Sequence, residues 1–112
     1  MELHEERVGD ACVVIAKGRL DGTASGAFAD RIGGLINGTR PKLLIDLAGV
    51  DFVSSAGLRA VLTLIKKIKA SGGAFALCGL QDQVREVLDI SGFTPMLSIH
   101  KGRADGLAAL GI

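Results

Sequence analysis

The stretch of residues 45–62 reads IDLAGVDFVSSAGLRAVL and decides the fold of this chain. It begins inside an apolar run, Lys42–Leu47, that predicts a buried central strand. A turn-rich connection follows and carries Ser54 and Ser55. Apolar residues then recur at helical spacing, which predicts an amphipathic helix over residues 56–70. The stretch therefore indicates a strand, a turn bearing two serines, and a helix.

Strand and helix signals alternate on both sides of this stretch. Before it, Glu2–Arg7 predicts an edge strand, Gly9-Asp10 a hairpin turn and residues 12–16 an apolar strand. Residues 23–36 predict a helix that Asp21 or Thr23 can cap at its start and that Gly38 is suited to end. After it, the pattern predicts a strand over residues 74–78, a helix over 82–90, a strand over 96–99 and a helix over 103–110. This alternation indicates an α/β fold with a mixed, mainly parallel sheet of about five strands, the first antiparallel, and about four helices.

Composition narrows the classes of function. The chain has 112 residues, 48% hydrophobic and 4% aromatic, which suits one aliphatic core and a single domain over residues 1–112. A net charge of +1 without a long basic run argues against nucleic-acid binding. The sequence shows neither a secretory signal pattern nor an apolar run long enough to span a bilayer, so we expect a cytoplasmic protein without membrane contact. In that location we expect the glycosylation sequon at residues 37–39 to stay unmodified. Cys12 and Cys78 lie in apolar runs and predict reduced structural thiols; we expect no metal and no cofactor.

The two serines stand where a helix begins. The first helical turn leaves backbone N–H groups unpaired and carries partial positive charge, so a phosphate on Ser55 would be favoured there. A helix cap is the plainer interpretation of a serine at this place. Gly57 weakens the helix start by about 1 kcal/mol relative to alanine, which indicates either a close approach to its backbone or unusual dihedral angles.

These motifs together resemble those of the STAS domain, which is found in bacterial anti-sigma factor antagonists. The resemblance rests on Ser55-Ala56-Gly57-Leu58, on Gly18-Arg19-Leu20-Asp21 after the second strand, on Ser71-Gly72-Gly73 and on Ile90-Ser91-Gly92-Phe93. It covers nearly the whole chain and implies a single-domain STAS-like fold. By this resemblance, Ser55 is the residue that is phosphorylated. The family's acidic residue before that serine is Ser54 here, which leaves Ser54 as an alternative acceptor.

The resemblance implies a partner switch. The unphosphorylated domain would bind an ATP-dependent serine kinase of the GHKL type, which doubles as an anti-sigma factor. Phosphorylation of Ser55 by that kinase would release the complex, and a serine phosphatase would reset it. We expect a docking surface of exposed positions that converge beside the motif, and it comprises Asp21, Thr23, Ser54, Ser55, Gly57, Arg59 and Thr63.

Two other classes of function compete with this interpretation. A nucleophilic serine needs a base within hydrogen-bond reach, and the two histidines, His4 and His100, have no obvious path to Ser55. The chain also lacks the Gly-x-Ser-x-Gly and phosphate-loop motifs, so we do not expect an enzyme. A STAS-type binding or scaffold module without phosphorylation is the alternative, and the neutral Ser54 favours it.

Overall fold

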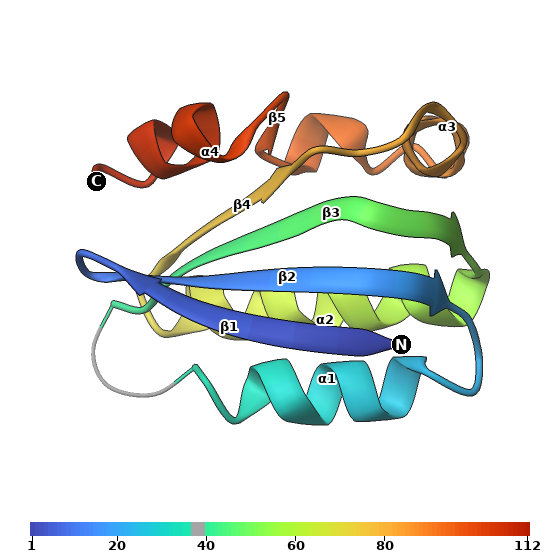
Figure 1. Cartoon of the computed structure of the whole chain (residues 1–112), viewed down its shortest axis with the longest axis horizontal. Helices are drawn as coiled ribbons and strands as arrows, with labels where there is room; N and C mark the ends of the chain where they lie inside the picture. The colour runs from blue at the N-terminus through green and yellow to red at the C-terminus, as the bar shows by residue number, and fades with distance from the viewer. Residues whose placement is uncertain (37–39) are drawn as a thin grey trace.

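A central sheet with strand order β1-β2-β3-β4-β5 organises the part of the chain that the structure describes (Figure 1). The computed structural model describes residues 1–36 and 40–112, so the sequon and the helix end predicted at Gly38 lie outside the described residues. The elements are β1 (Glu2–Val8), β2 (Ala11–Leu20), α1 (Ser25–Gly33), β3 (Lys42–Val53), α2 (Ser55–Ala70), β4 (Ala74–Cys78), α3 (Asp82–Ile90), a 3-10 turn (Thr94–Met96), β5 (Ile99–His100) and α4 (Arg103–Ala109). β1 pairs antiparallel with β2 and the other neighbours pair in parallel, which confirms the predicted α/β topology.

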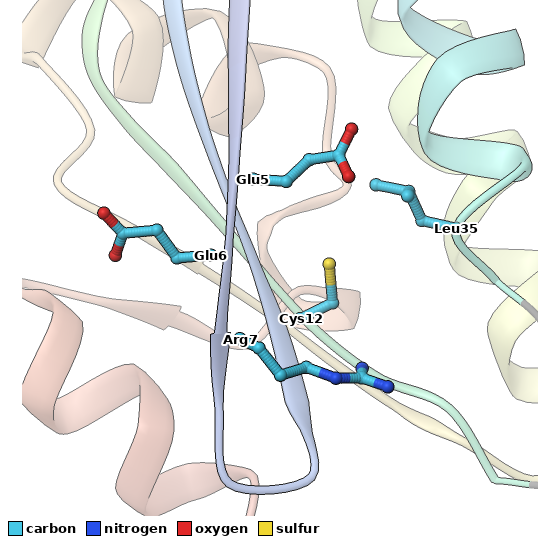
Figure 2. A pocket seen from close by; sticks show the side chains of 5 residues that line it. All are labelled: Glu5, Glu6, Arg7, Cys12 and Leu35. Atoms are coloured by element: carbon cyan, nitrogen blue, oxygen red, sulfur yellow. The ribbon is translucent and has the colours of Figure 1, made fainter.

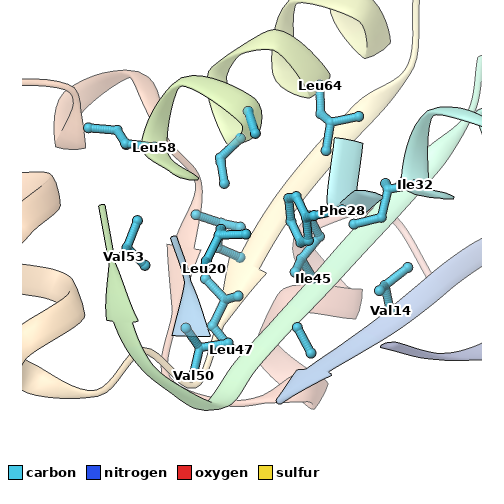
Figure 3. Packing of buried hydrophobic residues seen from close by; sticks show 14 of the residues in the cluster. Val14, Leu20, Phe28, Ile32, Ile45, Leu47, Val50, Val53, Leu58 and Leu64 are labelled. Atoms are coloured by element: carbon cyan, nitrogen blue, oxygen red, sulfur yellow. The ribbon is translucent and has the colours of Figure 1, made fainter. Parts of the chain in front are cut away.

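Two hydrophobic clusters hold the layers together. The larger cluster joins α1, α2 and α3 to one face of the sheet, and α1 and α2 lie side by side (Figure 1). Its members include Val14, Leu20, Phe28, Ile32, Ile45, Leu47, Val50, Val53, Leu58 and Leu64 (Figure 3). The smaller cluster lies on the opposite face under α4 and includes Val13, Leu44, Cys78 and Leu110. Burial of these aliphatic side chains at about 25 cal/mol per Å² is the main stabilising contribution.

Strands β2 and β3 are longer than the sequence predicted. Residues 12–16 and Lys42–Leu47 were the expected bounds, whereas pairing continues to Leu20 and Val53. Register shifts between Ile15 and Lys17 and between Gly18 and Arg19 carry the ladder past polar and glycine residues that interrupt the alternation. β3 therefore runs beyond β4, whose pairing with β3 ends at Asp46.

Helix α1 and strand β5 also differ from their predicted bounds. The helix expected over residues 23–36 is α1, which is shorter because the chain leaves the helix at Gly33-Gly34. Ala24 occupies its N-cap position, so the cap expected from Asp21 or Thr23 is wrong. The last strand, expected over residues 96–99, is Ile99–His100, because Pro95 lies in a 3-10 turn that occupies Thr94–Met96.

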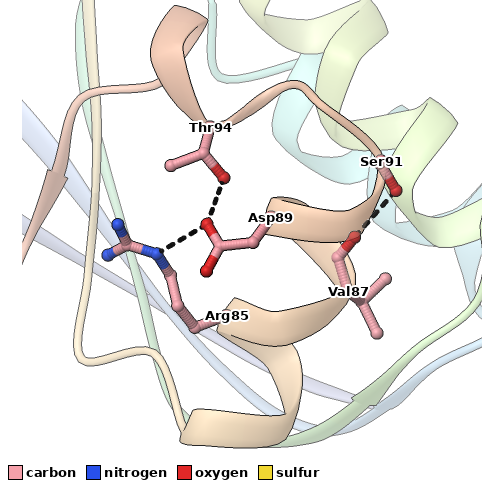
Figure 4. A network of polar contacts seen from close by, with 5 residues as sticks. All are labelled: Arg85, Val87, Asp89, Ser91 and Thr94. Atoms are coloured by element: carbon pink, nitrogen blue, oxygen red, sulfur yellow. Dashed lines mark hydrogen bonds and ion pairs between the residues drawn. The ribbon is translucent and has the colours of Figure 1, made fainter.

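A polar network fixes the end of α3 (Figure 4). The Asp89 carboxylate accepts hydrogen bonds from the Thr94 hydroxyl at 2.6 Å and from Nε of Arg85 at 3.2 Å. The Ser91 hydroxyl donates to the Val87 carbonyl at 2.7 Å. The Thr94 bond, and after it Arg85, lowers the pKa of Asp89. The network ties α3 to the turn that leads into β5.

Candidate functional site

Ser54 caps helix α2. Its hydroxyl oxygen accepts a hydrogen bond from the Gly57 N–H at 3.1 Å, so one of the unpaired donors of the first turn is satisfied. The same hydroxyl lies 3.4 Å from the Leu20 carbonyl oxygen, to which it donates, and the Ser54 N–H donates to that oxygen at 2.9 Å. Ser54 is half-buried and its hydroxyl is engaged on both sides. Serine thus does at this position the capping work that a carboxylate can also do.

Ser55 is the first residue of α2 and is exposed. Among the hydrogen bonds of residues 1–36 and 40–112, none involves its hydroxyl. The two neighbouring serines therefore differ in chemistry: one hydroxyl is occupied by the fold, and the other faces solvent beside the positive end of the helix dipole. This geometry favours Ser55 over Ser54 as an acceptor for phosphate.

Gly57 is buried against the end of β2. A Cβ at this position would lie 2.2 Å from the Leu20 carbonyl oxygen and 2.8 Å from Leu20 Cγ. Gly57 is absent from the described glycines with positive φ, so close approach of the backbone, and not unusual dihedral angles, explains the glycine. Its predicted exposure is wrong, because β2 covers the first turn of α2.

Asp21 organises the turn between β2 and α1. One of its carboxylate oxygens accepts from the Thr23 hydroxyl at 2.7 Å and from the N–H groups of Thr23 and Ala24, each at 3.1 Å. The Thr23 hydroxyl is the main cause that lowers the pKa of Asp21; the backbone bonds add to it, and the charge of Arg19 contributes least. Asp21 and Thr23 thus form a hydrogen-bonded turn next to Leu20, whose carbonyl oxygen accepts from Ser54.

Arg59 and Thr63 continue the exposed face of α2 below Ser55. These residues follow Ser55 by four and eight positions, so the three share one side of the helix, and all are exposed. The Thr63 hydroxyl donates to the Arg59 carbonyl at 2.9 Å, which is a local bond within the helix. Arg59 thus presents a cation one turn away from Ser55.

Sequence reasoning missed Phe52 and Arg19. The guanidinium carbon of Arg19 lies 4.1 Å from the centroid of the Phe52 ring, and Phe52 remains 37% exposed. The available signal was an aromatic residue two positions before Ser54 in a chain with only four Phe and no Trp or Tyr. The prediction that β3 ended at Leu47 hid the pairing of these two residues.

The hollow in Figure 2 lies at the other end of the sheet. It measures about 330 Å³ and is lined by Glu5, Glu6, Arg7, Cys12 and Leu35. Burial, and after it the charge of Glu5, raises the pKa of Cys12. The pKa of Cys78 is raised to about 11, and burial is the largest cause. Both cysteines are free thiols, as predicted, and neither borders the serines.

A comparison with protein families assigns this chain to a family. The family model described as the STAS domain matches residues 3–106. The chain belongs to the STAS domain family. BtrV of Bordetella bronchiseptica, which is named as an anti-sigma factor antagonist, is 28% identical over 109 residues and matches 97% of this chain and 94% of its own length.

Solved STAS structures share this fold. A STAS-domain anti-sigma-factor antagonist protein of Planctomyces limnophilus superposes with a TM-score of 0.86 at 22% identity, over 98% of each chain. An anti-sigma factor antagonist of Mycobacterium paratuberculosis gives a TM-score of 0.88 at 23% identity, over 99% of this chain and 94% of its own. At these identities the likeness concerns the fold. No helix among the residues described here is both long and apolar enough to cross a bilayer.

Proposed function

We propose that this chain is an anti-sigma factor antagonist that acts by partner switching. Unphosphorylated, it binds an anti-sigma factor that is a GHKL-type serine kinase, and phosphorylation of Ser55 releases it; a serine phosphatase restores the binding form. Residues 1–112 act as one STAS-like domain in the cytoplasm, as a binding protein and not as an enzyme. The observation that carries this proposal is the solvent-facing Ser55 hydroxyl beside a Ser54 hydroxyl that is engaged in the cap.

The electrostatics of the site support release by phosphate. A phosphoserine brings about −1.5 to −2 charges and three acceptor oxygens. Because the Ser55 hydroxyl holds no part of the described structure together, its modification changes the surface without breaking a bond of the fold. A binding cost of about 1.4 kcal/mol suffices for a tenfold weaker complex.

The docking surface proposed for the kinase comprises Asp21, Thr23, Ser54, Ser55, Arg59 and Thr63, with Gly57 setting the position of the helix beneath them. The hydrogen-bonded turn of Asp21 and the cap at Ser54 meet at Leu20, which supports a single preformed surface. Such preorganisation reduces the entropy lost on binding.

Capture of partners from the native cytoplasm with ATP, followed by mapping of phosphate on the captured chain, tests the proposal. We expect a GHKL-type kinase in the complex and phosphate on Ser55. Ser54→Asn is the matched control, because asparagine keeps the cap but removes the neighbouring hydroxyl; phosphorylation should persist in it and disappear in Ser55→Ala. Ser55→Asp should weaken binding of the purified kinase at least tenfold. Phosphate found only on Ser54 would contradict the residue assignment.

The neutral Ser54 favours one second candidate, a STAS-type binding or scaffold module that is never phosphorylated. This candidate predicts a complex whose affinity is the same for the wild-type chain and for Ser55→Asp. The two candidates therefore separate in the same binding experiment.

A further inference from the structure

An exposed aromatic–arginine pair stands beside the serine site. Arg19 and Phe52 are partners in the parallel ladder of β2 and β3, and the guanidinium carbon lies 4.1 Å above the ring. The other three phenylalanines are buried or half-buried, whereas Phe52 is 37% exposed. Phe52 is thus the most exposed aromatic residue of the chain, and its ring is covered on one side by Arg19.

The direction of the two side chains follows from the strands. Leu20 and Val53, the next residues along each strand, are buried in the larger cluster beneath α2. Successive side chains of a strand point to opposite faces, so Arg19 and Phe52 point to the face that carries α4. The smaller cluster under α4 draws on β2 and β3 through Ala11, Val13 and Leu44, all near the strand starts. The ends of β2 and β3 thus extend beyond that cluster.

Phe52 is close enough to Ser55 to share its partner. Three residues of extended chain span at most about 11 Å. A standard interface covers roughly 800 Å² on each protein, which corresponds to a disc of about 16 Å radius. An interface of this size centred on Ser55 therefore extends past the backbone of Phe52. A kinase that wraps over the ends of β2 and β3 meets the Phe52 ring on the face that carries α4.

We propose that Phe52 and Arg19 form the anchor of the kinase-docking surface: the ring enters an apolar pocket of the kinase, and a carboxylate on the rim of that pocket binds the guanidinium. The inference rests on the proposed function. Aromatic and arginine side chains are enriched among the residues that dominate binding energy. Stacking on the ring already orients Arg19, and its planar group has donors left for a bidentate carboxylate contact.

The first test measures affinity for the purified kinase from the capture experiment. Phe52→Ala should weaken binding at least tenfold. Ile112→Ala is the matched control: Ile112 is 41% exposed and lies beside Gly9 in the turn between β1 and β2, at the opposite end of the sheet from Phe52 and Ser55 (Figure 1). The substitution removes an exposed apolar side chain far from Ser55 and should change affinity less than twofold. Arg19→Met keeps a chain that can lie on the ring but loses the charge, and it should weaken binding at least fivefold. Wild-type affinity in Arg19→Met would overturn the carboxylate contact.

A second measurement does not depend on how Phe52→Ala folds. A photoreactive benzoylphenylalanine at position 52 should cross-link to the kinase, and the same group at position 112 should not. If Phe52→Ala binds the kinase with wild-type affinity, or if cross-linking is equal at both positions, the anchor is overturned. The proposed function still stands in that case if Ser55→Asp releases the kinase. If Phe52→Ala releases the kinase and Ser55→Asp does not, the anchor is supported and the phosphorylation switch is refuted. If the wild-type chain binds no serine kinase, both the anchor and the proposed function are refuted.

Discussion

Replacement of Gly57 by alanine tests how the serine site is built. The new Cβ would lie 2.2 Å from the Leu20 carbonyl oxygen, more than an ångström inside ordinary contact, and the obstacle is backbone that cannot rotate away. That same oxygen accepts the hydrogen bond from the Ser54 N–H. Alanine gains about 1 kcal/mol in helix propensity. Overpacking of this kind costs typically about 1–3 kcal/mol, and the contact is shorter than a rotamer change can relieve. Because the obstacle is backbone, we expect the upper part of that range, about 2–3 kcal/mol, which leaves a net destabilisation of about 1–2 kcal/mol after the gain in helix propensity.

Urea denaturation measures the effect, with Gly26→Ala as the matched control. Gly26 also lies in the first turn of its helix, α1, but a Cβ there would meet nothing within 4 Å. The control should therefore be neutral or stabilised by up to about 1 kcal/mol. In Gly57→Ala, the amide resonances of Leu20 and Ser54 should shift as α2 moves away from β2. A Gly57→Ala protein as stable as the control would refute the packing argument.

Three further predictions follow from individual contacts. Ser54→Ala should lower the free energy of unfolding by about 1 kcal/mol because the cap is lost, whereas Ser55→Ala should leave urea denaturation unchanged; equal losses would contradict the assignment of the cap. The pKa of Asp89 is lowered in the folded state, so the network at the end of α3 stabilises the fold above the ordinary carboxylate range near pH ~4 and loses this contribution as the pH falls through the lowered pKa. In an NMR titration, Thr94→Val should raise the pKa of Asp89, and an unchanged value would argue against the Thr94 bond. The Cys78 thiol should react with a thiol reagent at neutral pH only after unfolding, since burial raises its pKa to about 11, whereas rapid reaction of the native protein would show that α4 opens.

Much of the fold was readable from local patterns. The apolar stripe of α2 predicted most of its buried face: of Leu58, Val61, Leu62, Ile65 and Ile68, only Leu62 is half-buried and the other four are buried. The length of β2 and β3 was not readable, because Lys17-Gly18 and Ala48-Gly49 interrupt the alternation and the ladder passes them through register shifts. Bulges are set by the neighbouring strand, which a single segment does not reveal.

The candidate site was also predicted in part from the sequence. Two serines at a helix start were evident, but which hydroxyl caps the helix depends on where α2 begins. The exposure of Gly57 was predicted wrongly, because Leu20 lies 37 positions earlier in the chain and its carbonyl reaches Gly57 only when β2 extends to its full length. Phe52 was missed for the same reason, since its partner Arg19 lies on the unpredicted part of β2.

The Leu20 carbonyl oxygen joins the parts on which a switch of this kind depends. It accepts the Ser54 N–H, faces the Ser54 hydroxyl and leaves room only for glycine at position 57. The start of α2 is therefore held from behind, by backbone of β2, while Ser55 stands in front with its hydroxyl free of the described structure. A group added to Ser55 would lie in solvent and not in the core, so we expect the conformation and stability of the domain to stay unchanged. A charge placed there acts on whatever protein covers the surface, and the affinity for that protein is the property that we expect to change.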